Sequence, residues 1–327
     1  MKKTIIYSIL AVIAIVITAI CANEAVANPK GKKITIKVGS YNLMTSDSRV
    51  KHIAKTPGMS DQRHWCHSAQ AVASIISDMD CDIIGLQEIC DSIWGWTGDK
   101  GFREMMANDG NESYDWVLYP NGSTGRNSYN VAIGYKSDKF TELESGIYWL
   151  AGIFDRSEAL PTAPKGSKRP CVWAKFQHKE SGKIFYFFST HFVVPGISSE
   201  GNAYNAENCV KYAEQLMESR KMPSIIVGDF NGAKGSPSYK IVAESGRWYD
   251  VYECLKEEGM LSSEETGWGT CNDKDEKKWA YWRPDHITCD GNFRPVSFET
   301  IRKKYPTADG TLHYPSDHFP IVAELKL

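Results

Sequence analysis

Five short segments of the chain carry side chains that could bind a metal ion and a phosphate group. Each contains a carboxylate, an amide or an imidazole, and most follow an apolar run typical of a β-strand. Sheet scaffolds usually present reactive groups where their strands end. One such segment would mean little, but together they predict metal-dependent hydrolysis of a phosphate ester. The segments are Ser40–Asn42, Gly85–Glu88, Ser189–His191, Gly228–Asn231 and Ser316–His318.

This chemistry explains why these residue types are needed. Hydrolysis brings an anionic nucleophile to an anionic centre, and a divalent cation neutralises the phosphate oxygens and stabilises the leaving oxygen. Mg²⁺ prefers oxygen ligands and keeps several waters, so one or two carboxylates suffice; Mn²⁺ accepts the same ligands. Glu88 is the best single candidate, because it follows a buried strand where an uncompensated carboxylate would be costly.

The periodicity of apolar residues predicts the elements that position these groups. Helices are predicted for residues 62–79 and 206–217, each with one apolar face. Many strands with about two long helices between them favour an α/β (α+β) fold, in which two sheets pack face to face with helices outside. The predicted strands cover residues 34–40, 82–86, 130–135, 184–189, 224–228 and 321–325.

Residues 155–170 are rich in Pro, Lys and Ser, have no periodicity, and are interpreted as a long exposed loop. Lys165, Lys168 and Arg169 cluster there. They could contact a polyanionic backbone, or they could form an ordinary solvated basic surface.

The motifs in this order resemble the endonuclease/exonuclease/phosphatase superfamily, also called the deoxyribonuclease I-like fold. The resemblance covers residues 34–327, which are interpreted as one domain, and implies a two-sheet β-sandwich flanked by helices. Any one motif is a weak signal, but six in the family's order are specific. They are Tyr41-Asn42, Gln87-Glu88, Thr190-His191, Gly228-Asp229-Phe230-Asn231, Arg283-Pro284-Asp285-His286-Ile287 and Ser316-Asp317-His318-Phe319-Pro320.

The resemblance also implies a metal site and a general base. Asn42 and Asp317 would help Glu88 to form the metal site. His318 would activate the attacking water, a role that suits imidazole because its pKa lies near neutrality. Asp285 would orient His318, as the carboxylate of a catalytic triad does, with water replacing serine.

Three further residues are expected to contact the water or the phosphate. By resemblance, Asp229 would orient or deprotonate the nucleophilic water, and Asn231 would hydrogen-bond the phosphate. His191 would stabilise or protonate a phosphate oxygen from the other side. Gly228 permits an unusual turn where the strand before Asp229 ends.

Departures from the family pattern limit this transfer. Pro284 and His286 stand where the family commonly has Ile and Tyr around Asp285. Because proline lacks a backbone donor, the strand there is expected at a sheet edge or with a bulge.

Two other departures concern charged partners. Ser128 stands where close relatives often carry Glu, so that His191 is expected to lack that carboxylate partner. Asn205 and Asn208 fall where many relatives carry Arg, so a basic contact to phosphate is expected to be missing.

The superfamily hydrolyses DNA, RNA, phospholipid headgroups, inositol phosphates and nucleotide-like esters, and the core motifs do not choose among them. We expect a nuclease-type phosphodiesterase. A phospholipase C-like sphingomyelinase, a small-molecule phosphatase and a catalytically silent binding protein on the same fold are the alternatives. The expected partner is a phosphoester, with nucleic acid as one candidate, and the chain is expected to be monomeric. Its formal net charge of −2 means that nucleic acid would need a local basic patch.

Residues 1–27 have the pattern of an export signal: two lysines, an apolar stretch at 5–20, and Ala25-Val26-Ala27 before a cleavage point. This predicts a periplasmic, secreted or surface location. An uncleaved anchor is the alternative, because the apolar stretch is slightly long. A lipid anchor at Cys21 is disfavoured by the bulky Ile20.

Eight cysteines remain after residue 27. An even number permits disulfides in an exported protein, although the pairing cannot be read from the sequence. Alternatively, several of these thiols could be small buried apolar groups.

Overall fold

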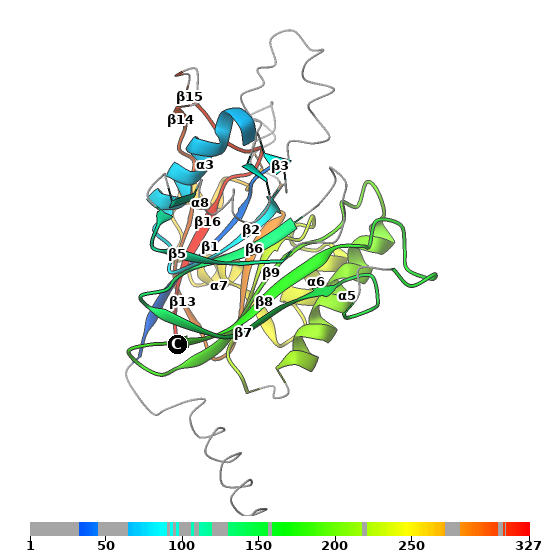
Figure 1. The fold of residues 1–327 in the computed structure, drawn as a ribbon. Coiled ribbons are helices and arrows are strands. Elements are labelled where there is room, and N and C mark those ends of the chain that lie inside the picture. The colour runs from blue at the N-terminus through cyan, green and yellow to red at the C-terminus, as the bar shows by residue number, and fades with distance from the viewer. Residues whose placement is uncertain are drawn as a thin grey trace, which may run out of the picture.

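Two six-stranded sheets lie face to face in the computed structural model (Figure 1). The structure describes residues 33–44, 65–89, 92–93, 96–97, 106–107, 111–119, 130–155, 159–217, 221–271, 282–306, 310 and 312–327. The first sheet has the order β13-β16-β1-β2-β6-β5 and the second has the order β11-β12-β10-β9-β8-β7. The predicted α/β sandwich is therefore confirmed.

The strands of the first sheet are β1 (Thr35–Asn42), β2 (Ile83–Ile89), β5 (Tyr114–Leu118), β6 (Asn130–Lys136), β13 (Arg294–Thr300) and β16 (Ile321–Lys326). Those of the second are β7 (Phe140–Trp149), β8 (Pro170–His178), β9 (Ile184–His191), β10 (Ser224–Asp229), β11 (Trp248–Asp250) and β12 (Asp285–Asp290). Two small ribbons pair β3 (Ser92–Ile93) with β4 (Trp96–Thr97), and β14 (Tyr305–Pro306) with β15 (Leu312–His313). The helices are α3 (Trp65–Met79), α5 (Ser199–Leu216), α6 (Pro237–Ala243), α7 (Val251–Glu257) and α8 (Ser263–Thr266).

All six predicted strands are observed. Five have ends within two residues of those expected, and β2 extends three residues further than predicted, to Ile89. The first predicted helix is α3. The second is α5, which begins earlier, at Ser199, because the side chain of Ser198 accepts a hydrogen bond from the amide of Gly201 and so caps the helix.

The alternation of side chains along each strand divides the apolar residues between the interior and the outer layers. In β9, Phe185 and Phe187 lie in the cluster between the two sheets, whereas Tyr186 and Phe188 belong to the cluster on the outer face. β10 alternates in the same way, with Val227 inside and Ile226 outside. Successive side chains of a strand point to opposite faces, so one apolar run serves two layers.

Helices cover the outer face of each sheet. Val72, Ile75 and Ile76 of α3 pack with Ile84 and Leu86 of the first sheet. On the second sheet, α5 supplies Ala206, Cys209, Tyr212 and Ala213 to the outer cluster, and α6 supplies Val242. Figure 1 shows α3 on one side of the sandwich and α5 with α6 on the other.

Strand direction brings the ends of five strands to the same side of the sandwich. β1 and β2 are parallel, with Asn42 opposite Gln87, and β9 and β10 are parallel, with Asp229 opposite His191. β12 runs antiparallel to β10 and begins at Asp285, opposite Asp229. The polar ends of these strands therefore meet at one edge.

A glycine lets the two sheets approach each other near this edge. A Cβ atom at Gly85 would lie 2.4 Å from Val227 Cγ2 and 2.8 Å from Ser189 Oγ. Since both neighbours belong to the second sheet, the side chain of any other residue would push the sheets apart.

We expect Gly85→Ala to lower the free energy of unfolding by roughly 1–3 kcal/mol, the usual cost of overpacking a core. Urea denaturation measures this change. Gly196→Ala is the matched control, because its Cβ would meet its nearest neighbour, Val194 Cγ1, at 3.9 Å. Equal shifts of the two midpoints would contradict the prediction.

The cysteines that the structure describes are free thiols, and four of them are buried. They are Cys81, Cys171, Cys209, Cys254, Cys271 and Cys289. The permitted disulfides are therefore not formed among these six, whereas Cys66 and Cys90 lie outside the residues whose side chains are described.

Among the residues that the structure describes, no helix has both the length and the apolar character needed to cross a membrane. The predicted export signal at residues 1–27 lies outside the described ranges.

Candidate functional site

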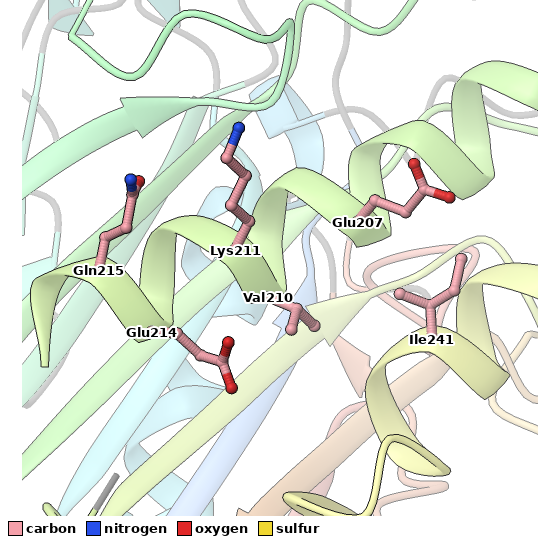
Figure 2. A pocket seen from close by; sticks show the side chains of 6 residues that line it. All are labelled: Glu207, Val210, Lys211, Glu214, Gln215 and Ile241. Carbon is pink, nitrogen blue, oxygen red and sulfur yellow. The ribbon is translucent and has the colours of Figure 1, made fainter. Parts of the chain in front are cut away.

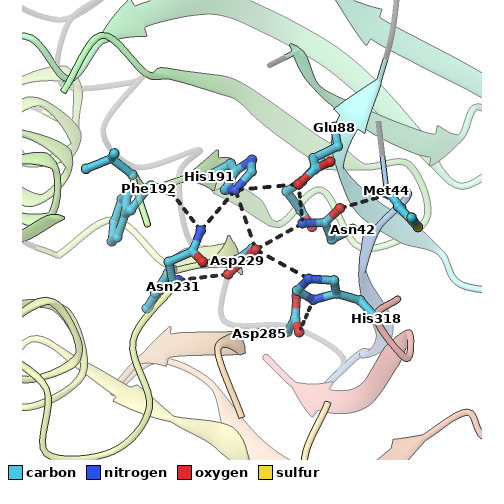
Figure 3. A network of polar contacts seen from close by, with 12 residues as sticks. Asn42, Met44, Glu88, His191, Phe192, Asp229, Asn231, Asp285 and His318 are labelled. Carbon is cyan, nitrogen blue, oxygen red and sulfur yellow. Dashed lines mark hydrogen bonds and ion pairs between the residues drawn. The ribbon is translucent and has the colours of Figure 1, made fainter. Parts of the chain in front are cut away.

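Seven of the eight predicted site residues form one connected polar cluster at the strand ends (Figure 3). Both sheets contribute to it, and His318 comes from the segment before β16. The cluster contains Asn42, Glu88, His191, Asp229, Asn231, Asp285 and His318.

Asn42, at the end of β1, joins the carboxylates of the two sheets. Its Nδ2 donates to Glu88 Oε1 at 3.2 Å and to Asp229 Oδ2 at 2.9 Å. Its Oδ1 accepts from the amide of Met44 at 3.0 Å, which fixes the orientation of the side-chain amide. In this arrangement Asn42 holds two carboxylates together, and its predicted role as a metal ligand through Oδ1 requires the amide to turn over.

Glu88 sits at an irregular point of β2. The register with β6 shifts between Gln87 and Ile89, and Glu88 has φ of 60°. A non-glycine residue in this left-handed region costs free energy and is often found at functional sites. The bulge interrupts the alternation of β2, so Glu88 reaches Asn42 and lies 4.0 Å from His191 Nε2.

Asp229 is the most connected member of the cluster and is almost completely buried. Its Oδ1 accepts from the amide of Asn231 at 2.7 Å. Its Oδ2 lies 3.5 Å from His191 Nε2 and 3.9 Å from His318 Nε2. Burial, reinforced by the charge of Asp285, raises the pKa of Asp229 to about 7.

The loop that carries Asp229 adopts unusual backbone angles. Gly228 has φ of 148°, and a Cβ there would lie 2.0 Å from the carbonyl oxygen of Thr190. Asn231 has φ of 47°, a region that asparagine tolerates better than most residues. Glycine is thus required where the strand turns into the site.

Asn231 determines the tautomer of His191. Its Nδ2 donates to the carbonyl of Phe192 at 2.9 Å and lies 3.0 Å from His191 Nε2. Because the first bond fixes this nitrogen as the donor, His191 Nε2 accepts and its proton sits on Nδ1. Burial, together with the charges of Arg169 and His318, lowers the pKa of His191 well below its ordinary value, so the ring is neutral.

His318 and Asp285 form a close pair. His318 Nδ1 lies 2.8 Å from Asp285 Oδ2, and its Nε2 faces Asp229. Burial alone would lower the pKa of His318, but the Asp285 carboxylate outweighs it and holds the pKa well above the ordinary value. The pair has the geometry of an imidazole oriented by a carboxylate.

Thr270 supports this pair and was not among the predicted residues. Its hydroxyl donates to Asp285 Oδ2 at 2.6 Å and accepts from the amide of Asp285 at 3.3 Å. Thr270 lies in a loop fifteen positions before Asp285, and its local sequence has no pattern that could have identified it.

Ser316 explains why a serine begins the Ser-Asp-His motif. Its hydroxyl donates to the carbonyl of Asn42 at 2.6 Å and accepts from the amide of His318 at 3.1 Å. The serine thereby fixes the His318 segment to the end of β1. Asp317 lies between them and is half-buried; its metal-binding role stays a prediction that rests on this adjacency.

The expected edge or bulge at Pro284 is wrong. β12 lies inside the sheet between β11 and β10, and it pairs with β10 in continuous register from Asp285. Pro284 precedes the first residue of the strand, where the ladder needs no donor from it, and its carbonyl accepts from the amide of Phe230.

His286 points away from Asp285, as neighbouring residues of a strand do. Its Nδ1 lies 2.6 Å from Asp250 Oδ2 and its Nε2 lies 2.8 Å from the carbonyl of Gly232. Both ring nitrogens are thus engaged, and His286 braces the loop that follows Asn231 instead of facing the cluster.

The predicted basic cluster in an exposed loop is wrong for Arg169. Lys165 and Lys168 are exposed, but Arg169 is 3% exposed and its charge acts on His191. A buried arginine therefore lies near the site, although the arginine common in the family helix is missing. Asn205 lies in the helix region where many relatives carry that arginine. Here it has a structural role, because its side-chain amide donates to the carbonyls of Leu150 and Ser167.

A shallow hollow of about 530 Å³ between α5 and α6 is lined by surface side chains and by none of the cluster residues (Figure 2). Its lining consists of Glu207, Val210, Lys211, Glu214, Gln215 and Ile241. It carries no group that the predicted chemistry needs.

The oxygen-rich part of the cluster fits a divalent cation. Glu88 and the half-buried Asp317 offer carboxylates, the hard ligands that Mg²⁺ and Mn²⁺ prefer. Burial raises the pKa of Asp229, and the neighbouring Asp285 carboxylate adds to this effect through its negative charge. A bound cation would favour the charged form of both carboxylates.

The family model for the Endonuclease/Exonuclease/phosphatase family matches residues 58–318. An endonuclease/exonuclease/phosphatase family protein from Bacteroides thetaiotaomicron superposes with a TM-score of 0.70 at 23% identity, covering 91% of this chain and 99% of that one. A Bacteroides thetaiotaomicron mannosyl-6-phosphatase gives 0.69 at 24% identity, covering 89% and 99%. The human Nocturnin catalytic domain, solved with bound sulfate, gives 0.63 at 16%, covering 90% and 96%.

No functionally curated protein matches the sequence. The structural likenesses are below 25% identity and show the fold, whereas the family model spans most of the chain. The chain therefore belongs to the endonuclease/exonuclease/phosphatase family of phosphoester hydrolases.

Proposed function

We propose that this protein is an exported, divalent-metal-dependent phosphoester hydrolase in which His318 activates the attacking water. The observation that carries the proposal is the pairing of His318 Nδ1 with Asp285 at 2.8 Å, with Nε2 facing the buried Asp229. This is the arrangement of a general base held by an orienting carboxylate.

Each side chain of the cluster has its own role in the proposed reaction. In the neutral ring, His318 Nδ1–H donates a hydrogen bond to Asp285, which leaves Nε2 to take a proton from water. The Asp285 carboxylate then stabilises the imidazolium that results. Asp229, fixed by Asn42 and by the amide of Asn231, orients that water. Glu88 and Asp317, with Asn42 as a further candidate ligand, would hold a divalent cation, which would supply charge neutralisation at the phosphate and at the leaving oxygen.

His191 and Asn231 form the opposite wall. His191 is neutral and Asn231 already uses both of its amide hydrogens, on Phe192 and His191. Asn231 therefore binds phosphate by exchanging one of these bonds, and the nearby Arg169 supplies positive charge to that side.

A small phosphorylated molecule is the substrate class that we place first. The basic loop that could contact a polyanion presents two exposed lysines, because Arg169 is buried, and the net charge of the chain is −2. The mannosyl-6-phosphatase of similar fold supports the same choice. A nuclease-type phosphodiesterase is the second candidate, and it is supported by the exposed Lys165 and Lys168.

One screen tests these proposals. Purified protein is incubated with mannose 6-phosphate, a generic phosphomonoester, a bis-phosphodiester, plasmid DNA, RNA and sphingomyelin, each with Mg²⁺ or with EDTA. We expect Mg²⁺-dependent phosphate release from the monoesters. Cleavage of DNA, RNA or the diester without phosphate release would select the second candidate. Full turnover in EDTA would exclude the metal requirement, and His318→Ala protein controls for contaminating hydrolases.

Export is supported by the pattern of residues 1–27. Expression of the full chain followed by cell fractionation tests it, and the mass of the product shows whether the segment is removed. Recovery of the uncut chain in the cytosol would contradict the proposal.

Thr270→Val should reduce kcat by roughly one to two orders of magnitude, because it removes a hydrogen bond to a charged group worth ~1.5–3 kcal/mol. Valine keeps the shape of threonine but cannot hold Asp285. Thr270→Ser is the rescue control, since it keeps the hydroxyl. If both variants lose the same activity, the hydroxyl does not position Asp285.

A further inference from the structure

Cys271 is held beside His318 by the backbone. The two residues form an isolated antiparallel bridge, and the amide of Phe319 donates to the carbonyl of Thr270. Cys271 Sγ lies 3.9 Å from His318 Nδ1, the same nitrogen that faces Asp285 Oδ2 at 2.8 Å. One sulfur, one nitrogen and one carboxylate oxygen thus lie within 4.8 Å of one another.

This trio differs in chemistry from the oxygen-rich side of the cluster. Zn²⁺ binds Cys, His and Asp at about 2.0–2.3 Å, so tetrahedral ligand atoms are about 3.5 Å apart. To reach this spacing, the distance from Cys271 Sγ to His318 Nδ1 needs to shorten by a few tenths of an ångström. The distance from His318 Nδ1 to Asp285 Oδ2 needs to lengthen by a similar or slightly larger amount. A thiolate favours Zn²⁺ and disfavours Mg²⁺, which selects oxygen.

A second observation also indicates a cation here. Asp285 is 1% exposed, and its other carboxylate oxygen, Oδ1, has no hydrogen-bond partner among the residues that the structure describes. A buried carboxylate oxygen without a partner is unfavourable. A cation beside the same carboxylate would compensate for it.

We propose that Cys271, Asp285 and His318 form a second cation site, selective for thiophilic ions such as Zn²⁺, whose occupation inhibits hydrolysis. The three side chains supply a thiolate, a carboxylate oxygen and the Nδ1 lone pair of the imidazole. Water or a phosphate oxygen completes the tetrahedron, because a site with three protein ligands leaves one position open.

Occupation inhibits by changing the tautomer of His318. Binding replaces the thiol proton of Cys271 and the Nδ1 proton of the ring, and a neutral ring then carries its remaining proton on Nε2. Starting from a thiol and an imidazolium, two protons pass to the solvent. With Nε2 protonated, the ring cannot take a proton from water. This consequence rests on the proposed role of His318 as the base, whereas the site itself does not.

Co²⁺ reports the site directly, because a cobalt–thiolate bond gives a charge-transfer band in the near ultraviolet. The full-length protein is stripped with EDTA, dialysed and titrated with Co²⁺, and Zn²⁺ is then added. We expect the band to appear at one equivalent and to be lost on adding Zn²⁺. Cys271→Ser should abolish it, while Cys254→Ser, a half-buried thiol of α7, should keep it.

A parallel titration measures inhibition by Zn²⁺ at saturating Mg²⁺, with each variant normalised to its own activity without Zn²⁺. The concentration for half-inhibition should rise at least tenfold in Cys271→Ser and stay unchanged in Cys254→Ser. Near-ultraviolet circular dichroism shows whether Cys271→Ser is folded, and Cys271→Ala serves as a second variant if it is not.

The outcomes separate the site from its consequence. No band in the wild-type protein, or a band that persists in both Cys271 variants, would overturn the site. If the Zn²⁺ concentration for half-inhibition is the same in wild type and Cys271→Ser, the inhibitory ion binds the oxygen ligands proposed for Mg²⁺. That result would also overturn the proposal. A band that requires Cys271, without inhibition, would keep the site and reject His318 as the base.

Discussion

His318→Ala should lower kcat/KM by a factor of about 10² or more, the usual contribution of a positioned general base. Its Nε2 faces the site and its Nδ1 is held by Asp285, so removal of the ring removes both the proton acceptor and the partner of a buried carboxylate. Asp285→Ala should cost a similar factor, because the ring loses the group that fixes its tautomer.

The decisive measurement is a double-mutant cycle. If His318 and Asp285 act as one unit, the double variant should be little worse than His318→Ala alone, since losses within a catalytic unit are far from additive. The cycle is measured on kcat/KM with the substrate that the screen identifies. His178→Ala is a suitable control, because His178 bonds Ser181 in a turn after β8.

Fully additive losses would show that the pair does not work together. His286 would not then replace His318 as the base, because both of its nitrogens are engaged by Asp250 and Gly232.

Glu88→Gln should reduce activity severely at limiting Mg²⁺, by about 10²-fold or more if the cation supplies several kcal/mol of charge stabilisation. The substitution keeps the shape of the side chain and removes its charge. Excess Mg²⁺ should restore part of the activity, because the remaining oxygen ligands still bind the ion weakly. Steady-state rates across a Mg²⁺ titration measure both effects.

Glu144→Gln is the matched control for Glu88→Gln. Glu144 is an exposed glutamate beside a bulge of β7, at Glu142/Glu144, so its charge is screened by solvent. Wild-type turnover of Glu88→Gln at limiting Mg²⁺ would show that Glu88 is not a metal ligand.

The sequence predicted the parts of the fold in which local pattern and burial agree. β9 and β10 are short apolar runs that end in polar residues, and α3 has a continuous apolar face, so their existence could be inferred without knowing their neighbours. The meeting of Asp229 with His191 followed from the resemblance, and the parallel pairing of β9 with β10 explains it.

The remaining features depend on contacts that are distant in sequence. Thr270 supports Asp285 from a loop, and a threonine in a loop has no local signature. Arg169 was predicted to be exposed because its neighbours in the sequence are polar, but it directly precedes β8 and is buried. The bond from Asn42 to Asp229 joins two sheets, so its geometry could not be read from either segment.

The order in which the strands are made has a consequence for the growing polypeptide. β1 is synthesised first, but it lies between β2 and β16, and its ladder with β16 needs the last residues of the domain. Pairings of such long sequence separation form late, because a large loop must close before they contribute. A nascent chain that ends before Ser316 lacks both this strand and the imidazole of His318. During synthesis, β1 therefore lacks one of its two partner strands until the residues of β16 have been made.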